Sequence, residues 1–228
     1  MIFPYDPTFI LLIPALILAF YAQFKVQSAY SKMSKIRSKK GLTGAEAGRK
    51  LLDKAGLKQV DVEEIPGNLT DNYDPRDKKL HLSQGVHNSD SIAALGIVAH
   101  EVGHAVQDAK AYAPMKLRSG LVPAANIGSN LAMPLFFIGI LFSYPLLMDL
   151  GIVAFSLAVV FTLITLPVEF NASKRAIAML TDGGYVSTDE APMAKSVLDA
   201  AALTYVAATA MAVLNLIRLL AIRGSRRD

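Results

Sequence analysis

The 228-residue chain contains no cysteine and no tryptophan, and only 18% of its residues are charged. Without cysteine it can form neither disulfide bonds nor thiolate metal sites, so any metal ion would depend on histidine and carboxylate ligands. Charged residues make up about a quarter of a typical soluble domain. Because the chain is also 53% hydrophobic, its composition indicates a membrane protein.

Four long segments lack charged residues entirely: 8–24, 119–148, 150–168 and 200–217. Each is long enough, or nearly so, to cross a hydrocarbon core of about 30 Å as a helix. No basic segment precedes the first one and no cleavage-site pattern follows it, so we expect a retained membrane anchor rather than a secretory signal peptide. The sequence therefore predicts a mainly α membrane protein with about four hydrophobic helices.

We expect one integral-membrane domain over residues 1–228. Residues 119–168 would form a transmembrane hairpin that turns at Ser143-Tyr144-Pro145, and residues 200–222 a C-terminal hydrophobic helix. Residues 169–199 would supply a further helix and a loop.

Residues 25–118 indicate a small α+β unit. Thr43 and Glu46 form a capping-box pattern, which predicts a helix that ends near Gly56. Residues 59–65 and 78–83 look like strands of a short β-hairpin, with turn chemistry at 66–68 and 71–75. A free strand edge could bind an extended peptide by strand addition, or the sheet could simply pack against the next helix.

Basic residues are concentrated directly after the first apolar segment: Lys25, Lys32, Lys35, Arg37, Lys39 and Lys40. The positive-inside rule then predicts that residues 25–118 face the cytoplasm. The net charge of +4 is gathered near apolar segments rather than spread evenly, which argues against a nucleic-acid partner. If residues 200–217 span the bilayer, Arg223, Arg226 and Arg227 lie outside against this rule, so that last crossing stays open.

The sequence His-Glu-Val-Gly-His at residues 100–104 is an instance of H-E-x-x-H, inside a segment that we expect to be helical from about residue 89 to 108. On a helix, His100 and His104 project from one face and supply half of a tetrahedral zinc site. Glu101 can then act as the general base of a metallopeptidase without being a ligand. The alternative is a polar helix with two surface histidines, but burying them unpaired in so apolar a segment would be costly.

Such a site needs a third protein ligand. The candidates on the expected cytoplasmic side are His81, His87, Glu169, Asp182 and Glu190. We favour Glu169, because it directly follows an apolar segment and has no obvious partner there other than Lys174 or Arg175. Ser173 lies one turn further along the same helix face and could support the site. Tyr73, Tyr185 and Arg175 are candidates for contact with substrate or for stabilising an oxyanion.

Several short segments resemble the YugP-like neutral zinc metallopeptidases, a family of bacterial membrane proteins, over nearly the whole chain. These segments are residues 72–75, 80–83, 91–94, 99–107, 169–173 and 203–207. The resemblance implies a gluzincin-type catalytic unit, similar to that of HtpX-like membrane proteases, with one zinc ion per chain held by His100, His104 and Glu169 and with Glu101 as the base. His81 departs from the family pattern without affecting a ligand.

We therefore expect a zinc endopeptidase of the bacterial cell membrane that acts on proteins or peptides from the cytoplasmic side, alone, as a homo-oligomer or with a membrane partner. Two alternatives stay open. One is a non-catalytic membrane scaffold or adaptor with a vestigial metal site, since small residues along 201–212 suit close helix packing. The other is an intramembrane site-2-type protease that uses Asp182, although Thr181 interrupts the expected L-D-G pattern.

Overall fold

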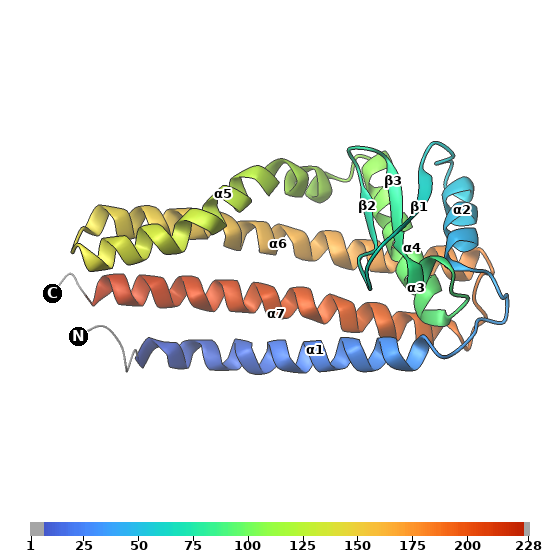
Figure 1. Cartoon of the computed structure of the whole chain (residues 1–228), viewed down its shortest axis with the longest axis horizontal. Coiled ribbons are helices and arrows are strands. Elements are labelled where there is room, and N and C mark those ends of the chain that lie inside the picture. The colour runs from blue at the N-terminus through green and yellow to red at the C-terminus, as the bar shows by residue number, and fades with distance from the viewer. Residues whose placement is uncertain (1–6, 226–228) are drawn as a thin grey trace. The chain divides into compact units, whose positions relative to one another are not determined.

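The protein is mainly helical, and the computed structural model describes residues 7–225 (Figure 1). In chain order the elements are the 3-10 helix η1 (Pro7–Leu12), α1 (Ile13–Met33), α2 (Gly44–Lys54), β1 (Asp61–Ile65), β2 (Asn72–Asp74), β3 (Lys79–Ser83), α3 (Gln84–His87), α4 (Ile92–Ala109), α5 (Ala113–Leu141), α6 (Pro145–Asp182) and α7 (Ala191–Gly224).

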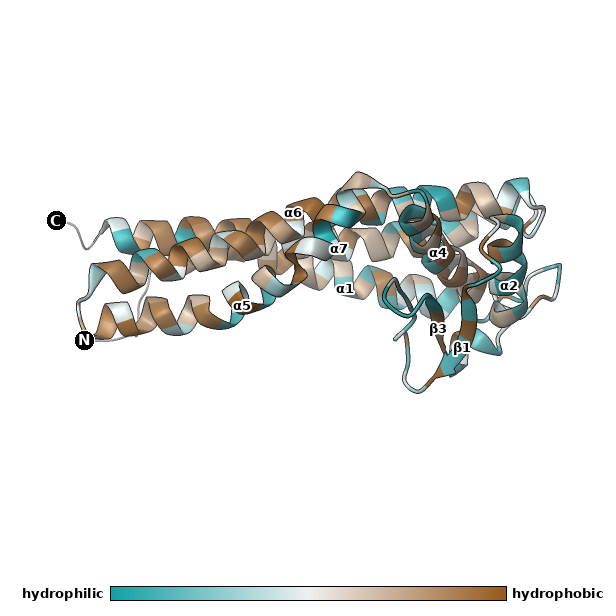
Figure 2. Ribbon diagram, turned by 90° about the horizontal axis from the view of Figure 1, so that it is seen from above, coloured by the Kyte–Doolittle hydropathy of each residue, from teal (hydrophilic) through white to brown (hydrophobic). Residues whose placement is uncertain are grey.

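Within residues 7–225, four helices are long and apolar enough to cross a membrane: η1 together with α1, then α5, α6 and α7. Hydrophobic residues follow one another along these helices, whereas hydrophilic residues are frequent in α2 and around the strands (Figure 2). The prediction of a mainly α membrane protein with four hydrophobic helices and a small α+β unit is confirmed. The last two helices are longer than their apolar segments, because α6 continues past Val168 to Asp182 and α7 begins at Ala191.

The chain divides into two compact units. In the described chain the first comprises residues 7–22, 117–166 and 204–225, with a small core built on Phe136, Met148, Ile152 and Leu219. Here α5 and α6 are joined by a tight turn, in which Ser143 adopts a φ of 52°. The two helices pack so closely that a Cβ atom on Gly151 would lie only 2.7 Å from the Ala132 carbonyl oxygen, and the absence of a side chain at Gly151 permits this approach.

An ion pair in this unit bears on the C-terminal arginines. Arg223 Nε donates to Asp149 Oδ1 at 2.8 Å, so the positive charge at the end of α7 is locally balanced by a carboxylate in the first turns of α6. Arg226 and Arg227 lie outside the described residues.

The second unit comprises residues 23–116 and 167–203 and holds the larger core, which surrounds α4. The predicted capping box is present at the start of α2: Glu46 N donates to Thr43 Oγ1, and Thr43 N donates to Glu46 Oε2 at 2.9 Å. Ser91 caps α4 by accepting a hydrogen bond from Ala94 N at 3.2 Å. These caps satisfy backbone donors that would otherwise be left unpaired at the helix starts.

The predicted hairpin between residues 59–65 and 78–83 is wrong in its pairing. The sheet has the order β1-β3-β2, in which β1 runs parallel to β3 and the hairpin is formed by β2 and β3. Residues 72–74, expected in a turn, form β2. The turn comes later, where Arg76 N donates to Asp74 Oδ1 and Lys78 adopts a φ of 58°. Asp71 fixes this arrangement by accepting hydrogen bonds from the backbone N–H and the hydroxyl of Ser83.

Candidate metal centre

Three potential metal ligands meet where α4 packs against α6. His100 Nε2 lies 3.2 Å and His104 Nε2 3.6 Å from Glu169 Oε2. Ligand atoms of the three residues all lie within 4.8 Å of one another. The three side chains retain between 4% and 13% of their full exposure, so the group is almost closed off from solvent.

The close approach of the two helices depends on Gly103, which lies between the two histidines. A Cβ atom on Gly103 would lie 2.8 Å from the carbonyl oxygen and 3.2 Å from the Cα atom of Ala172. These contacts are with backbone, which cannot move aside as a flexible side chain could. Ala172 lies one helical turn from Glu169, so the absence of a side chain at Gly103 lets α6 bring its carboxylate up to the imidazoles.

A chain of polar contacts behind His104 fixes the orientation of its ring. Arg175 Nε donates to Asn171 Oδ1 at 2.7 Å; a guanidinium has no acceptor, so the Asn171 atom that faces it must be oxygen. Gln107 Nε2 donates to the same Oδ1 at 3.0 Å and to the Val168 carbonyl oxygen at 2.8 Å. The orientation of both amides, which is usually ambiguous, is thus set by their partners.

Gln107 therefore presents Oε1 to His104 Nδ1, 2.9 Å away. An amide oxygen only accepts, so His104 Nδ1 carries the proton and Nε2 is the nitrogen that faces Glu169. Burial lowers the pKa of the imidazole, but the nearby carboxylates of Glu169 and Glu101 more than offset this and raise the pKa overall. A metal ion would replace the Nε2 proton and leave the Gln107 contact intact.

His100 is supported differently. Its Nδ1 lies 3.1 Å from Ser173 Oγ. A hydroxyl can donate or accept, so Ser173 holds the His100 ring in place without deciding which ring nitrogen carries the proton.

Glu101 lies next to this group and points toward the sheet. Its Oε2 accepts a hydrogen bond from Tyr73 N in β2 at 3.1 Å. Burial raises the pKa of the Glu101 carboxyl, and the imidazoles of His100 and His104 only partly oppose this. The side chain is thus an oriented carboxylate that accepts a proton more readily than an exposed glutamate would.

The phenol of Tyr73 is engaged elsewhere. Its hydroxyl donates to Asp108 Oδ2 at 2.8 Å, and Lys78 Nζ forms an ion pair with the same oxygen. Burial and then this hydrogen bond raise the pKa of the Tyr73 phenol. Tyr73 therefore contacts the site through its backbone N–H, while its side chain joins β2 to the C-terminal part of α4.

The donor atoms fit a zinc ion. Two imidazole nitrogens and one carboxylate oxygen are the three protein ligands of many catalytic zinc sites, which keep a fourth position open for water or substrate. On the far side of each imidazole, Gln107 Oε1 contacts His104 Nδ1 and Ser173 Oγ contacts His100 Nδ1, as groups that orient zinc-bound histidines do. Within residues 7–225 this is the one group of three or more such side chains with this spacing.

Comparison with known proteins identifies the family. Residues 8–224 match the family described as "Putative neutral zinc metallopeptidase". The chain belongs to this zinc metallopeptidase family. It is 45% identical over 218 residues to "Putative membrane protease YugP" of Bacillus subtilis (strain 168), and the alignment covers 96% of this chain and 97% of that protein. No solved structure matches.

In this member of the zinc metallopeptidase family, the other predicted ligands lie away from the centre. His81 Nε2 faces Glu63 and Asp77, and His87 Nδ1 faces Glu64. Asp182 is exposed at the end of α6. Glu190 is buried and accepts hydrogen bonds from the backbone N–H groups of Ser187 and Lys39, just before α7. None of these four belongs to the metal-ligand group.

The remaining predicted residues differ in position. Ser173 contacts His100, and Arg175 reaches the centre only through Asn171. Tyr185 lies in the turn after α6, packed against the main core. The sequence assigns no role to Gln107, Asn171 or Asp108. The available signal is that they lie on the same two helices as the ligands, and it does not specify which polar groups meet.

Proposed function

We propose that this family member is a zinc-dependent, membrane-bound endopeptidase that hydrolyses peptide bonds on the cytoplasmic side of the bilayer. The observation that carries the proposal is the meeting of His100, His104 and Glu169, which are up to 69 residues apart in sequence, with ligand atoms within 4.8 Å. A polar helix with two surface histidines would not be expected to meet a buried carboxylate from another helix at the same point.

His100, His104 and Glu169 would hold one zinc ion. Bound there, zinc supplies Lewis-acid polarisation of the scissile carbonyl and lowers the pKa of a water molecule toward about 7. The Gln107 and Ser173 contacts hold the two imidazoles in the ligating orientation. Ser173 is therefore a positioning residue, and so is Arg175, which acts on Gln107 through Asn171.

Glu101 acts as the general base. It takes a proton from the attacking water and delivers it to the leaving amine, so the same carboxyl must be able to hold the proton between the two steps. Burial, which raises the pKa of Glu101, supports this role. The Tyr73 backbone N–H orients the carboxylate. The Tyr73 phenol donates to Asp108, so Tyr73 serves the site through its backbone rather than its side chain.

The cytoplasmic orientation rests on the basic residues that follow the first apolar segment, between Lys25 and Lys40. The first helix usually dominates the orientation, so this basic cluster outweighs Arg223 at the C-terminal end of α7.

The test compares Glu101→Gln with the wild type and with Glu64→Gln, a control substitution of an exposed β1 carboxylate. We expect wild-type protein to contain one zinc ion per chain and to cleave unfolded casein or itself. Glu101→Gln should keep the zinc and lose at least about a hundredfold in rate, while Glu64→Gln retains activity. Wild-type protein that binds no zinc, or full activity in Glu101→Gln, would refute the proposal. Bound zinc without any cleavage would favour the scaffold alternative.

A further inference from the structure

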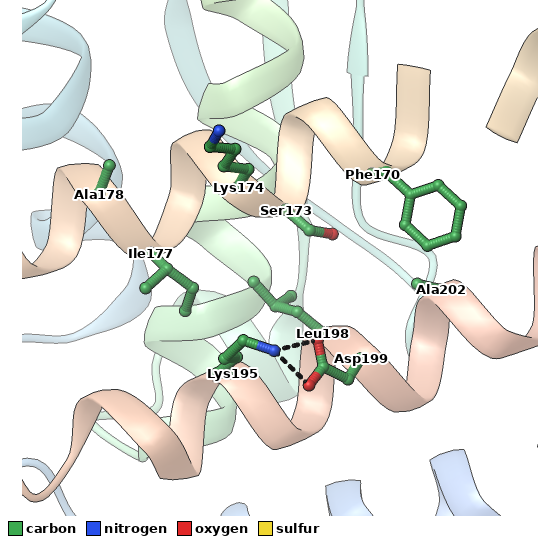
Figure 3. Close-up of a pocket in the computed structure, with 9 residues that line it drawn as sticks. All are labelled: Phe170, Ser173, Lys174, Ile177, Ala178, Lys195, Leu198, Asp199 and Ala202. Carbon is green, nitrogen blue, oxygen red and sulfur yellow. Dashed lines mark hydrogen bonds and ion pairs between the residues drawn. The ribbon is translucent and has the colours of Figure 1, made fainter. Parts of the chain in front are cut away.

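A groove of about 420 Å³ lies between α6 and α7, apart from the metal ligands. Its lining residues are Phe170, Ser173, Lys174, Ile177, Ala178, Lys195, Leu198, Asp199 and Ala202 (Figure 3). Most of its exposed lining is apolar. His100, Glu101, His104 and Glu169 are absent from the lining, and the groove adjoins the proposed zinc site at Ser173, whose hydroxyl oxygen lies 3.1 Å from His100 Nδ1.

Charged residues from both helices interrupt the otherwise apolar lining of the groove. On α6, Phe170 follows the apolar segment that ends at Val168, and on α7, Ala202 lies just inside the segment that starts at Ala200. Lys174 on α6 and Lys195 on α7 lie further from the apolar segments than Phe170 and Ala202 do. Phe170 remains 49% exposed, although it is a large apolar side chain beside an open groove.

The level of the two lysines along their helices matches that of lipid headgroups. At a rise of about 1.5 Å per residue, Lys174 lies about 9 Å beyond Val168 and Lys195 about 7.5 Å before Ala200. The headgroup layer extends about 5–8 Å outside the hydrocarbon core on each side. An ammonium group on a flexible lysine stem at this level can reach a phosphate.

We propose that this groove binds one anionic glycerophospholipid of the surrounding leaflet, with its phosphate at Lys174 and Lys195 and an acyl chain along Phe170, Leu198 and Ala202. The proposal requires the membrane insertion of α6 and α7 but neither zinc nor peptide cleavage.

The charges at the lip favour one phosphate group. Lys195 Nζ forms an ion pair with both oxygens of Asp199, at 2.8 and 2.6 Å, and retains a third N–H donor (Figure 3). Lys174 is exposed and extends from the side of α6 that faces away from α7 (Figure 3). Its side chain must change rotamer to bring the ammonium group to a headgroup at the mouth of the groove. With Asp199 included, the three charges sum to +1, which complements a single anionic headgroup rather than a zwitterionic one.

The experiment uses the full-length protein in detergent and measures binding of phosphatidylglycerol and phosphatidylcholine with identical chains, by native mass spectrometry. We expect tighter binding of phosphatidylglycerol. Each of Lys174→Gln and Lys195→Gln should weaken it about fivefold, and the double substitution about 25-fold. Lys58→Gln, which removes the same charge from an exposed site after α2, is the matched control and should leave binding unchanged.

A groove-filling substitution tests the location. Ala178 lines the groove and is exposed, so Ala178→Phe should fold and reduce phosphatidylglycerol binding, whereas Ala178→Ser should not. Equal binding of both lipids, or phosphatidylglycerol binding that ignores both lysines, would overturn the proposal. So would competition by unfolded casein together with a raised KM in the lysine variants, which would assign the groove to peptide. The lipid measurement is repeated on Glu101→Gln protein. Selective binding of phosphatidylglycerol by this variant would support the lipid site whether or not the wild-type protein cleaves peptides.

Discussion

Replacing Gly103 by alanine adds a single methyl group at the closest approach of α4 to α6. That methyl carbon would lie 2.8 Å from the Ala172 carbonyl oxygen, where ordinary contact begins near 3.4 Å. The helices must therefore separate by about half an ångström before the new atom fits. Since Glu169 lies one turn before Ala172, its carboxylate moves with the displaced backbone.

The effect on metal binding should exceed the effect on folding. Overpacking of this kind costs about 1–3 kcal/mol, and the higher helix propensity of alanine returns about 1 kcal/mol. The net loss of stability is thus at most about 2 kcal/mol. Metal–ligand distances, in contrast, tolerate only about 0.2 Å, so we expect zinc affinity to fall at least tenfold, as it does when groups that orient zinc ligands are lost.

Gly96 supplies the matched control on the same helix. A Cβ atom there would lie 3.5 Å from the nearest heavy atom, the Ala194 carbonyl oxygen, which is an ordinary contact. Gly96→Ala should keep zinc affinity unchanged and leave the melting temperature equal or slightly higher. The assay is zinc competition against a chelating dye, with thermal melts of the metal-free variants alongside. Wild-type affinity in Gly103→Ala would refute the idea that close backbone packing positions the third ligand.

Three further predictions concern the site and its helix. Arg175→Met should lower zinc affinity about tenfold by releasing the Asn171 amide. Lys174→Met, which removes the same charge from the adjacent residue, should leave zinc affinity unchanged. Equal losses of affinity in a dye competition would argue against the chain of contacts from Arg175 through Asn171 and Gln107 to His104. Ser91→Ala should cost about 1 kcal/mol by removing the α4 cap, seen as a lower melting temperature; an unchanged melt would contradict that role. Removing the metal with a chelator should lower the melting temperature, and added zinc should restore it. A melting temperature that the chelator leaves unchanged would argue against a bound metal.

Much of the architecture could be predicted from apolar segments and one motif. The four hydrophobic helices follow from uncharged segments of nearly 20 residues or more, because a bilayer leaves so few alternatives for such segments. Likewise, the capping box at Thr43 and Glu46 depends on residues three positions apart, and local signals of this kind survive folding.

Features that depend on distant partners were harder to predict. The predicted sheet pairing is wrong because the strand order depends on the hydrogen bonds from Ser83 to Asp71 and on the packing of β2 against α4. Neither contact is visible in a local sequence pattern. Gln107 and Asn171 were passed over for the same reason: each amide acquires its role only when α6 meets α4. The H-E-x-x-H spacing is informative because one helix carries it alone.

The zinc endopeptidase account is tested most directly by anomalous scattering at the zinc absorption edge from crystals of the full-length protein. We predict one anomalous peak per chain, within bonding distance of His100 Nε2, His104 Nε2 and a Glu169 carboxylate oxygen, at about 2.0–2.2 Å. A peak held by other residues, or none in zinc-supplemented crystals, would contradict the account.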